Sequence, residues 1–111
     1  LATLNEEQEQ ILGDAFGDIS PLLVRFIIEY GYGDVFSRNN LDARYRQIAT
    51  IAALTTSGNA SSQLIFHIRA ALHIGLSHSE IAEIMLLMTV YAGFPAAING
   101  ISALKGVVSG I

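Results

Sequence analysis

The chain has 111 residues, of which 51% are hydrophobic and only 14% are charged, and its formal net charge at pH 7 is −4. This length fits one ordinary domain and excludes two full hydrophobic cores, so a single domain over residues 1–111 is expected. The sequence contains no cysteine, which excludes disulfides, thiolate-bound zinc and thiol nucleophiles.

Composition also argues against several classes of partner. The six basic residues are scattered along the chain, whereas nucleic-acid binding requires a basic patch. The longest uncharged apolar stretch, residues 84–98, is shorter than the roughly 20 residues of a membrane span, and Pro95 interrupts it. No signal peptide is visible, so a cytoplasmic location is expected, while the start at Leu1 suggests that upstream residues are missing. So much apolar sequence in so small a domain predicts a homo-oligomer.

The first part of the chain predicts two helices. One covers residues 4–16, and Gly17 ends it. The second begins with Ser20 as N-cap and Pro21 at the first helical position, and it is expected to end near Gly31 or Gly33. Residues 32–40 are interpreted as an irregular connection, with room for one helical turn at residues 33–36.

The remainder predicts four more helices. A third covers residues 42–56, and a fourth covers residues 60–74, with Asn59 as its N-cap and Gly75 just past its end. Ser77 and Glu80 form a capping box at the start of the fifth helix, which runs to about residue 92.

A sixth helix follows Pro95 and runs to about residue 108. Gly100 and Gly106 inside it are disfavoured by about 1 kcal/mol each relative to Ala, so close helix packing is expected at both. No alternation typical of strands is present, and the predicted fold class is all-α with about six helices.

The histidines are the first candidates for chemistry. His67 and His73 are six residues apart on one helix, so they point in different directions and cannot share a metal ion, and no metal site is expected. Two interpretations of His67 remain open. It is either a core histidine bonded to a backbone carbonyl or a general acid or base, since burial moves its pKa.

Arg44, Arg46 and Gln47 open the third helix. They either form a solvated face with interhelical pairs or anchor a substrate carboxylate, for which arginine offers two parallel donors. Tyr91 is either a core residue or the wall of a pocket. No phosphate-binding glycine loop or serine nucleophile motif occurs, and no cofactor is expected.

Four runs of sequence resemble one family. In chain order they are LDARYRQIATIAALTTSGN, QLIFHIRAALHIGLSHSEIAEIM, YAGFPAAING and ALKG, between residues 41 and 106. They are similar to the carboxymuconolactone decarboxylase family, which includes the alkylhydroperoxidase-D-like proteins. The resemblance implies an all-helical fold and a homo-oligomer, a trimer or a hexamer.

The resemblance also narrows the chemistry. Redox members carry a C-x2-C pair at positions that correspond to Ala60 and Gln63, and a proton-relaying Glu at or next to Gln47. Only His67 of that relay is present, so thiol peroxidase activity is excluded. The decarboxylase branch, which removes CO2 from a γ-lactone carboxylic acid, is the better match. It implies that His67 acts as proton donor and that Arg44 or Arg46 holds a small carboxylate substrate.

Gln47, Gln63 and Tyr91 complete the expected substrate contacts. The alternative is a non-enzymatic or accessory oligomer that binds a small molecule, because the Cys and Glu of the redox site are absent. The surroundings of His67 distinguish the two. A histidine bonded only to backbone, with no adjoining cavity, favours the accessory role.

Overall fold

The computed structural model describes the backbone of residues 2–110 and the side chains of residues 9–110. Every element within that range is helical and none is a strand, which confirms the predicted all-α class. No helix in the described part of the chain is long and apolar enough to cross a membrane. In chain order the elements are α1 (Ala2–Phe16), α2 (Pro21–Phe26), the π-helical segment η1 (Ile27–Phe36), α3 (Ala43–Ser57), α4 (Ser61–His73), α5 (His78–Tyr91) and α6 (Phe94–Val108).

The chain divides into two compact units, Leu1–Asn40 and Leu41–Ile111. In the first, α1 packs against α2 and η1, and Leu12 and Tyr32 are the buried apolar residues among its described side chains. The ring of Tyr32 lies 5.6 Å from the ring of Phe36, both within η1.

The second helix of the sequence prediction starts as expected and ends later. The Ser20 side chain accepts a hydrogen bond from the Leu23 amide, and Pro21 is the first helical residue. The predicted end near Gly31 or Gly33 is wrong, because the chain continues in π-helical form through Phe36. The two glycines lower the preference for α-helix, and here the backbone changes its helical type instead of leaving the helix.

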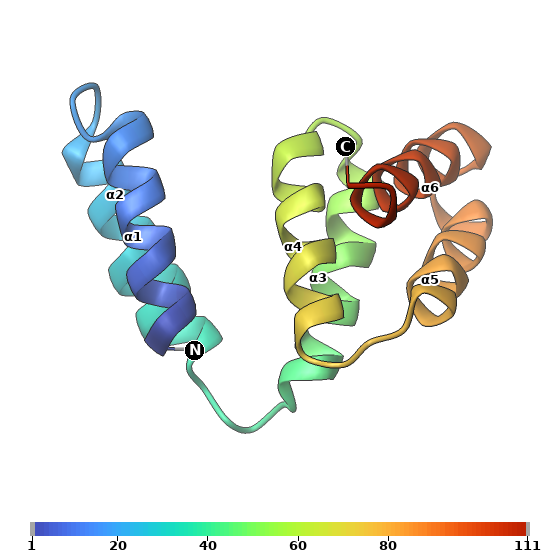
Figure 1. Cartoon of the computed structure of the whole chain (residues 1–111), viewed down its shortest axis with the longest axis horizontal. Coiled ribbons are helices and arrows are strands. Elements are labelled where there is room, and N and C mark those ends of the chain that lie inside the picture. Colours follow the sequence, from blue (N-terminus) through green and yellow to red (C-terminus); the bar gives the residue numbers. More distant parts are fainter. Residues whose placement is uncertain (1, 111) are drawn as a thin grey trace. The chain divides into compact units, whose positions relative to one another are not determined.

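In the second unit α3 and α4 lie side by side, and so do α5 and α6 (Figure 1). Further packing of α3 on α5 and of α4 on α6 joins the two pairs around one apolar core. The buried members of this core are Ile51, Leu64, Ile68, Ala71, Leu76, Ile81, Ile84, Met85, Met88 and Leu104.

Two of the four helices described in this unit, α3 and α5, begin with a side-chain cap. Asp42 caps α3 by accepting the Arg44 amide, and the capping box of Ser77 and Glu80 starts α5 as predicted. The expectation that Asn59 caps α4 is wrong. The N-cap is Ala60, which makes no side-chain hydrogen bond. Gly75 follows the end of α4 with φ of 106°, a conformation that favours glycine.

Gly100 and Gly106 of α6 differ in their surroundings. A Cβ on Gly100 would collide with Met85 Sδ of α5 and press on the Thr55 methyl group of α3, so close packing explains this glycine. A Cβ on Gly106 would meet nothing within 4 Å, so the same prediction for Gly106 is wrong.

Both methionines of the sequence lie in this core beside threonine hydroxyls of α3. Thr55 Oγ1 donates to the Ile51 carbonyl at 2.7 Å and lies 3.5 Å from Met85 Sδ. Thr56 Oγ1 lies 3.4 Å from Met88 Sδ. Because sulfur is a weak acceptor, the Thr55 hydroxyl is satisfied by the Ile51 carbonyl, and the two thioethers fill apolar space beside the threonines.

Candidate active site around His67

His67 lies in the middle of α4 on the face that enters the core, next to Leu64, Ile68 and Ala71. Its side chain is 6% exposed, and it is the only buried ionisable side chain among residues 41–110. The ring of Phe66 meets the imidazole edge-on, with centroids 5.0 Å apart. The sequence singled out this histidine for its apolar neighbours, and the structure places it in such surroundings.

A side chain from the neighbouring helix holds the imidazole. Nδ1 of His67 lies 3.1 Å from Oε1 of Gln47, which is on α3 and only 5% exposed. This partner is an amide side chain on another helix. Gln47, predicted as a substrate contact, lies against the histidine itself.

Burial determines the charge of His67. Removal from water disfavours the imidazolium and lowers the pKa of His67 from 6.5 to about 4. The ring is consequently neutral at pH 7. An anion placed next to a neutral, buried imidazole raises its pKa, so the binding of an acid can be coupled to the uptake of a proton by the ring.

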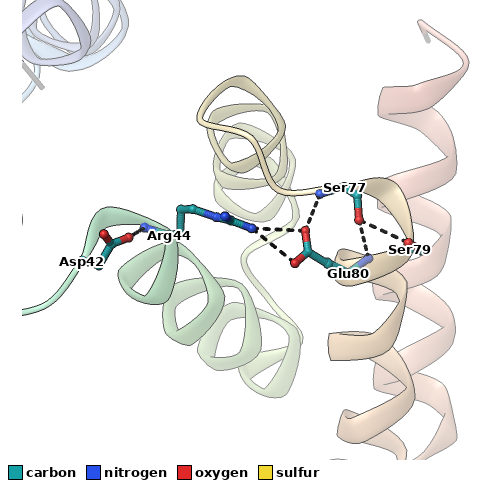
Figure 2. A network of polar contacts seen from close by, with 5 residues as sticks. All are labelled: Asp42, Arg44, Ser77, Ser79 and Glu80. Atoms are coloured by element: carbon teal, nitrogen blue, oxygen red, sulfur yellow. Dashed lines mark hydrogen bonds and ion pairs between the residues drawn. The ribbon is translucent and has the colours of Figure 1, made fainter.

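Arg44 belongs to a polar network that ties the start of α3 to the start of α5 (Figure 2). Its Nη2 lies 3.3 Å from one carboxylate oxygen of Glu80 and 3.4 Å from the other. Glu80 in turn accepts the Ser77 backbone amide at 2.8 Å. The pKa of the Glu80 carboxyl is lowered, mainly by this amide bond, with smaller contributions from the Ser77 side chain and Arg44. Arg44 thus already binds a carboxylate, and its side chain is 48% exposed.

The other predicted contacts lie in different surroundings. Arg46 donates from Nη2 to the Leu41 carbonyl at 3.1 Å and is partly buried. Gln63 is exposed at the start of α4, and Tyr91 is 75% exposed at the end of α5. Among the predicted site residues, Gln47 and His67 form a hydrogen bond with each other.

A cavity of about 390 Å³ lies where the end of α3 and the start of α4 meet α6. Its polar lining comes from Thr55, Ser61, Asn99 and Ser102, and no charged side chain lines it. Ala60 is part of its wall, whereas His67 is not. Sequence patterns did not reveal this cavity, because its lining is drawn from three helices and has no local spacing.

A second hollow, of about 400 Å³, lies along α5 and α6 and is mainly apolar. Its lining includes Met85, Leu86, Phe94, Ile98 and Ile101. Within the described residues no group of three or more His, Cys, Asp or Glu side chains lies close enough together to hold a metal ion.

Comparison with known proteins agrees with the resemblance seen in the sequence. Residues 21–106 match the model of the carboxymuconolactone decarboxylase family. A 15.0 kDa protein encoded between nqo9 and nqo10 in Paracoccus denitrificans is 36% identical over 83 residues, which cover 74% of this chain and 62% of the relative.

Two relatives are named for decarboxylation. The 4-carboxymuconolactone decarboxylase of Acinetobacter baylyi is 36% identical over 72 residues, 65% of this chain and 53% of the relative. The nitrosuccinic acid decarboxylase npaB of Metarhizium robertsii is 34% identical over 73 residues, 66% of this chain and 50% of the relative. The chain therefore spans between 50% and 62% of the length of these curated relatives. Because the family match covers most of the sequence, the chain belongs to the carboxymuconolactone decarboxylase family.

Proposed function

We propose that the protein is a cofactor-independent decarboxylase of a small acid whose carboxylate-bearing carbon can pass electrons to an acceptor group. Family membership and the two relatives named as decarboxylases support this assignment. In a carboxylated unsaturated lactone the acceptor is the lactone carbonyl, and in nitrosuccinic acid it is the nitro group. Such a substrate brings its own electron sink, so the protein must supply only binding, a dry environment and a proton.

The single observation that carries the proposal is the buried pair of His67 and Gln47. As CO2 leaves, the carbon–carbon bond breaks and its electron pair moves into the acceptor group of the substrate. A proton must then reach carbon, and His67 is the donor that we assign. The pKa of His67 is about 4, so the ring is neutral before binding, and the substrate anion raises that pKa until the ring takes up a proton.

Release of CO2 from 4-carboxymuconolactone and from nitrosuccinate tests the proposal. Wild type is expected to turn over at least one acid, and His67→Ala is expected to lose about 10²-fold or more in kcat, because a general acid contributes that much. His67→Gln serves as a second variant in case the alanine variant does not fold. His73→Ala is the matched control, because His73 is an exposed histidine of the same helix. Absence of turnover by wild type at high enzyme concentration contradicts the proposal for these acids.

A specific observation favours the second candidate, an accessory protein that binds a small molecule. The cavity beside the start of α4 has neither His67 nor any charged group in its lining. In that role both acids raise the melting temperature of wild type and His67→Gln equally, and no CO2 is released. An Ala96→Phe substitution, which fills the cavity, then abolishes the thermal shift.

The same proposal includes self-association as a trimer or hexamer. No charged residue occurs between Glu83 and Lys105, and the exposed apolar side chains of α5 and α6 include Leu86, Val90 and Phe94. An uncharged apolar surface of this kind is typical of subunit interfaces rather than of surfaces that face water.

A further inference from the structure

We propose that Gln47 is a positioning residue that holds neutral His67 with its proton on Nδ1, so that Nε2 is the nitrogen that takes up and delivers the proton. The catalytic part of this inference rests on the proposed decarboxylase function. The tautomer does not, because it follows from the hydrogen bond between α3 and α4.

The first step of the argument is the chemistry of the amide. Oε1 of Gln47 lies 3.1 Å from Nδ1 of His67, and an amide oxygen only accepts hydrogen bonds. Nδ1 must therefore carry a hydrogen. A neutral imidazole has one N–H, so Nε2 carries none and acts as the basic nitrogen.

The second step is burial. His67 and Gln47 are 6% and 5% exposed, so water does not readily replace either partner. Loss of a hydrogen-bond partner destabilises the protein more when the donor or acceptor is buried than when it lies at the surface, where water replaces the partner. In the other tautomer, Nδ1 carries no hydrogen and would face the amide oxygen, so two acceptors would repel each other. That tautomer is favourable only if the Gln47 amide rotates by about 180° and presents its NH2 group.

The third step concerns charge. A carboxylate in place of the Gln47 amide would stabilise the imidazolium and raise the pKa of His67. The neutral amide orients the ring in the same way without adding charge. His67 thus keeps its low affinity for protons until substrate arrives, and a weakly held proton is easily passed to carbon.

Nitrogen NMR of the histidine side chains tests the tautomer directly. The His67 signals are assigned by their loss in His67→Gln. Wild type is expected to show a protonated Nδ1 and an unprotonated Nε2 at pH 7. Gln47→Leu is expected to give a mixture of tautomers, and Gln47→Glu to restore the wild-type tautomer. Gln10→Leu is the matched control, because Gln10 is an exposed glutamine of α1.

Kinetics supply the second readout. Gln47→Leu should lower kcat in proportion to the fraction of His67 that adopts the other tautomer, with little change in KM, because a catalytic histidine in the wrong tautomer cannot act. In wild type kcat/KM should fall tenfold per pH unit above the pKa of the free enzyme, since only the protonated form can deliver a proton. Gln47→Glu should move the start of this fall upward by about 1 to 3 pH units.

The possible outcomes separate the two proposals. A wild-type spectrum with the proton on Nε2, or a tautomer unchanged in Gln47→Leu, overturns the role of Gln47 whatever the activity. Wild type that holds the proton on Nδ1 but releases no CO2 overturns the proposed reaction and supports the tautomer assignment.

Discussion

At the scale of single residues, one imidazole is held in the buried interior of the second unit, where it is 6% exposed. Transfer from water to the protein interior is more unfavourable for the charged imidazolium than for the neutral ring, so burial lowers the pKa of His67 to about 4. Gln47 offers the ring a neutral acceptor, which satisfies Nδ1 without restoring the charge. The stability of the fold is therefore linked to the protonation of this residue.

The linkage predicts acid sensitivity. Above pH 6.5 His67 is neutral in both folded and unfolded chains, and it adds no pH dependence. Between pH 6.5 and pH 4 the unfolded chain binds a proton that the folded chain does not, so stability falls as pH decreases. The shift corresponds to a loss of about 3 kcal/mol over this window.

Urea unfolding at several pH values checks this prediction. His67→Gln should remove most of the pH dependence between pH 6.5 and pH 4, whereas His73→Gln removes an exposed imidazole of the same helix without altering the core. A wild-type stability that stays constant over this range contradicts the account of His67.

The two arginines of α3 give a second prediction at this scale. Arg44 forms an ion pair with the Glu80 carboxylate, and its side chain is about half exposed. A substrate carboxylate could therefore replace Glu80 as its partner. Arg44→Gln is expected to raise KM about tenfold or more with a smaller effect on kcat, because a charge-assisted bond to substrate is lost. Arg46→Gln is the comparison. If Arg46→Gln raises KM and Arg44→Gln does not, the substrate carboxylate binds Arg46 instead.

At the scale of elements, the helix ends show what local sequence can predict. The capping box of Ser77 and Glu80 was predicted because both partners lie within one turn. Asn59 is a residue type that is preferred at the N-cap, yet α4 begins at Ser61. The N-cap position is held by Ala60, whose side chain makes no hydrogen bond. Contacts of α3 and α4 around Leu64 and Ile51 outweigh a single capping bond.

Contacts between elements were harder to foresee. His67 was chosen from the sequence because its neighbours on α4 are apolar, but its partner Gln47 is 20 residues away on another helix. The ion pair of Arg44 with Glu80 spans 36 residues. No spacing rule within one helix encodes such a pair, because it depends on how α3 crosses α4 and α5.

The two glycines of α6 give a prediction at this scale. Gly100→Ala should destabilise the protein by about 1 to 3 kcal/mol, because the added methyl group collides with Met85 in a filled core. Gly106→Ala should stabilise it by roughly 0.5 to 1 kcal/mol, since its Cβ meets open space and alanine favours helix. Chemical unfolding measures both. Equal effects at the two sites would contradict the close approach of α5 and α6 at Gly100.

At the scale of the whole molecule, the balance of apolar surface is unusual. Tyr91 is 75% exposed, Val90 74% and Phe94 70%, all at the junction of α5 and α6. A hollow of about 400 Å³ lies along these two helices. Large side chains beside an apolar hollow could interlock with the same features of another subunit, and the oligomer predicted from composition stays a prediction that this surface allows to be tested.

Analytical ultracentrifugation tests this assembly. Wild type is expected to sediment as a trimer or hexamer, and Ile98→Glu should shift it toward smaller species, because a buried unpaired carboxylate is strongly disfavoured in an interface. Ala49→Glu places the same charge on the exposed surface of α3 and is the control. A monomeric wild type, or an Ile98→Glu variant of unchanged mass, contradicts an interface on α5 and α6.

The placement of Met85 and Met88 against threonines of α3 also bears on how the protein withstands oxidants. Methionine is converted to its sulfoxide when peroxide reaches the thioether, and cysteine reacts even more readily when exposed. This sequence has no cysteine, and its two methionines are 0% and 7% exposed. Met85 Sδ occupies the space where a Gly100 side chain would lie, so an added oxygen on Met85 would have to fit into space that is already filled. In the folded protein both thioethers are therefore inaccessible to peroxide. Oxidation of Met85 is expected to report that the protein has unfolded, not merely that it has met an oxidant.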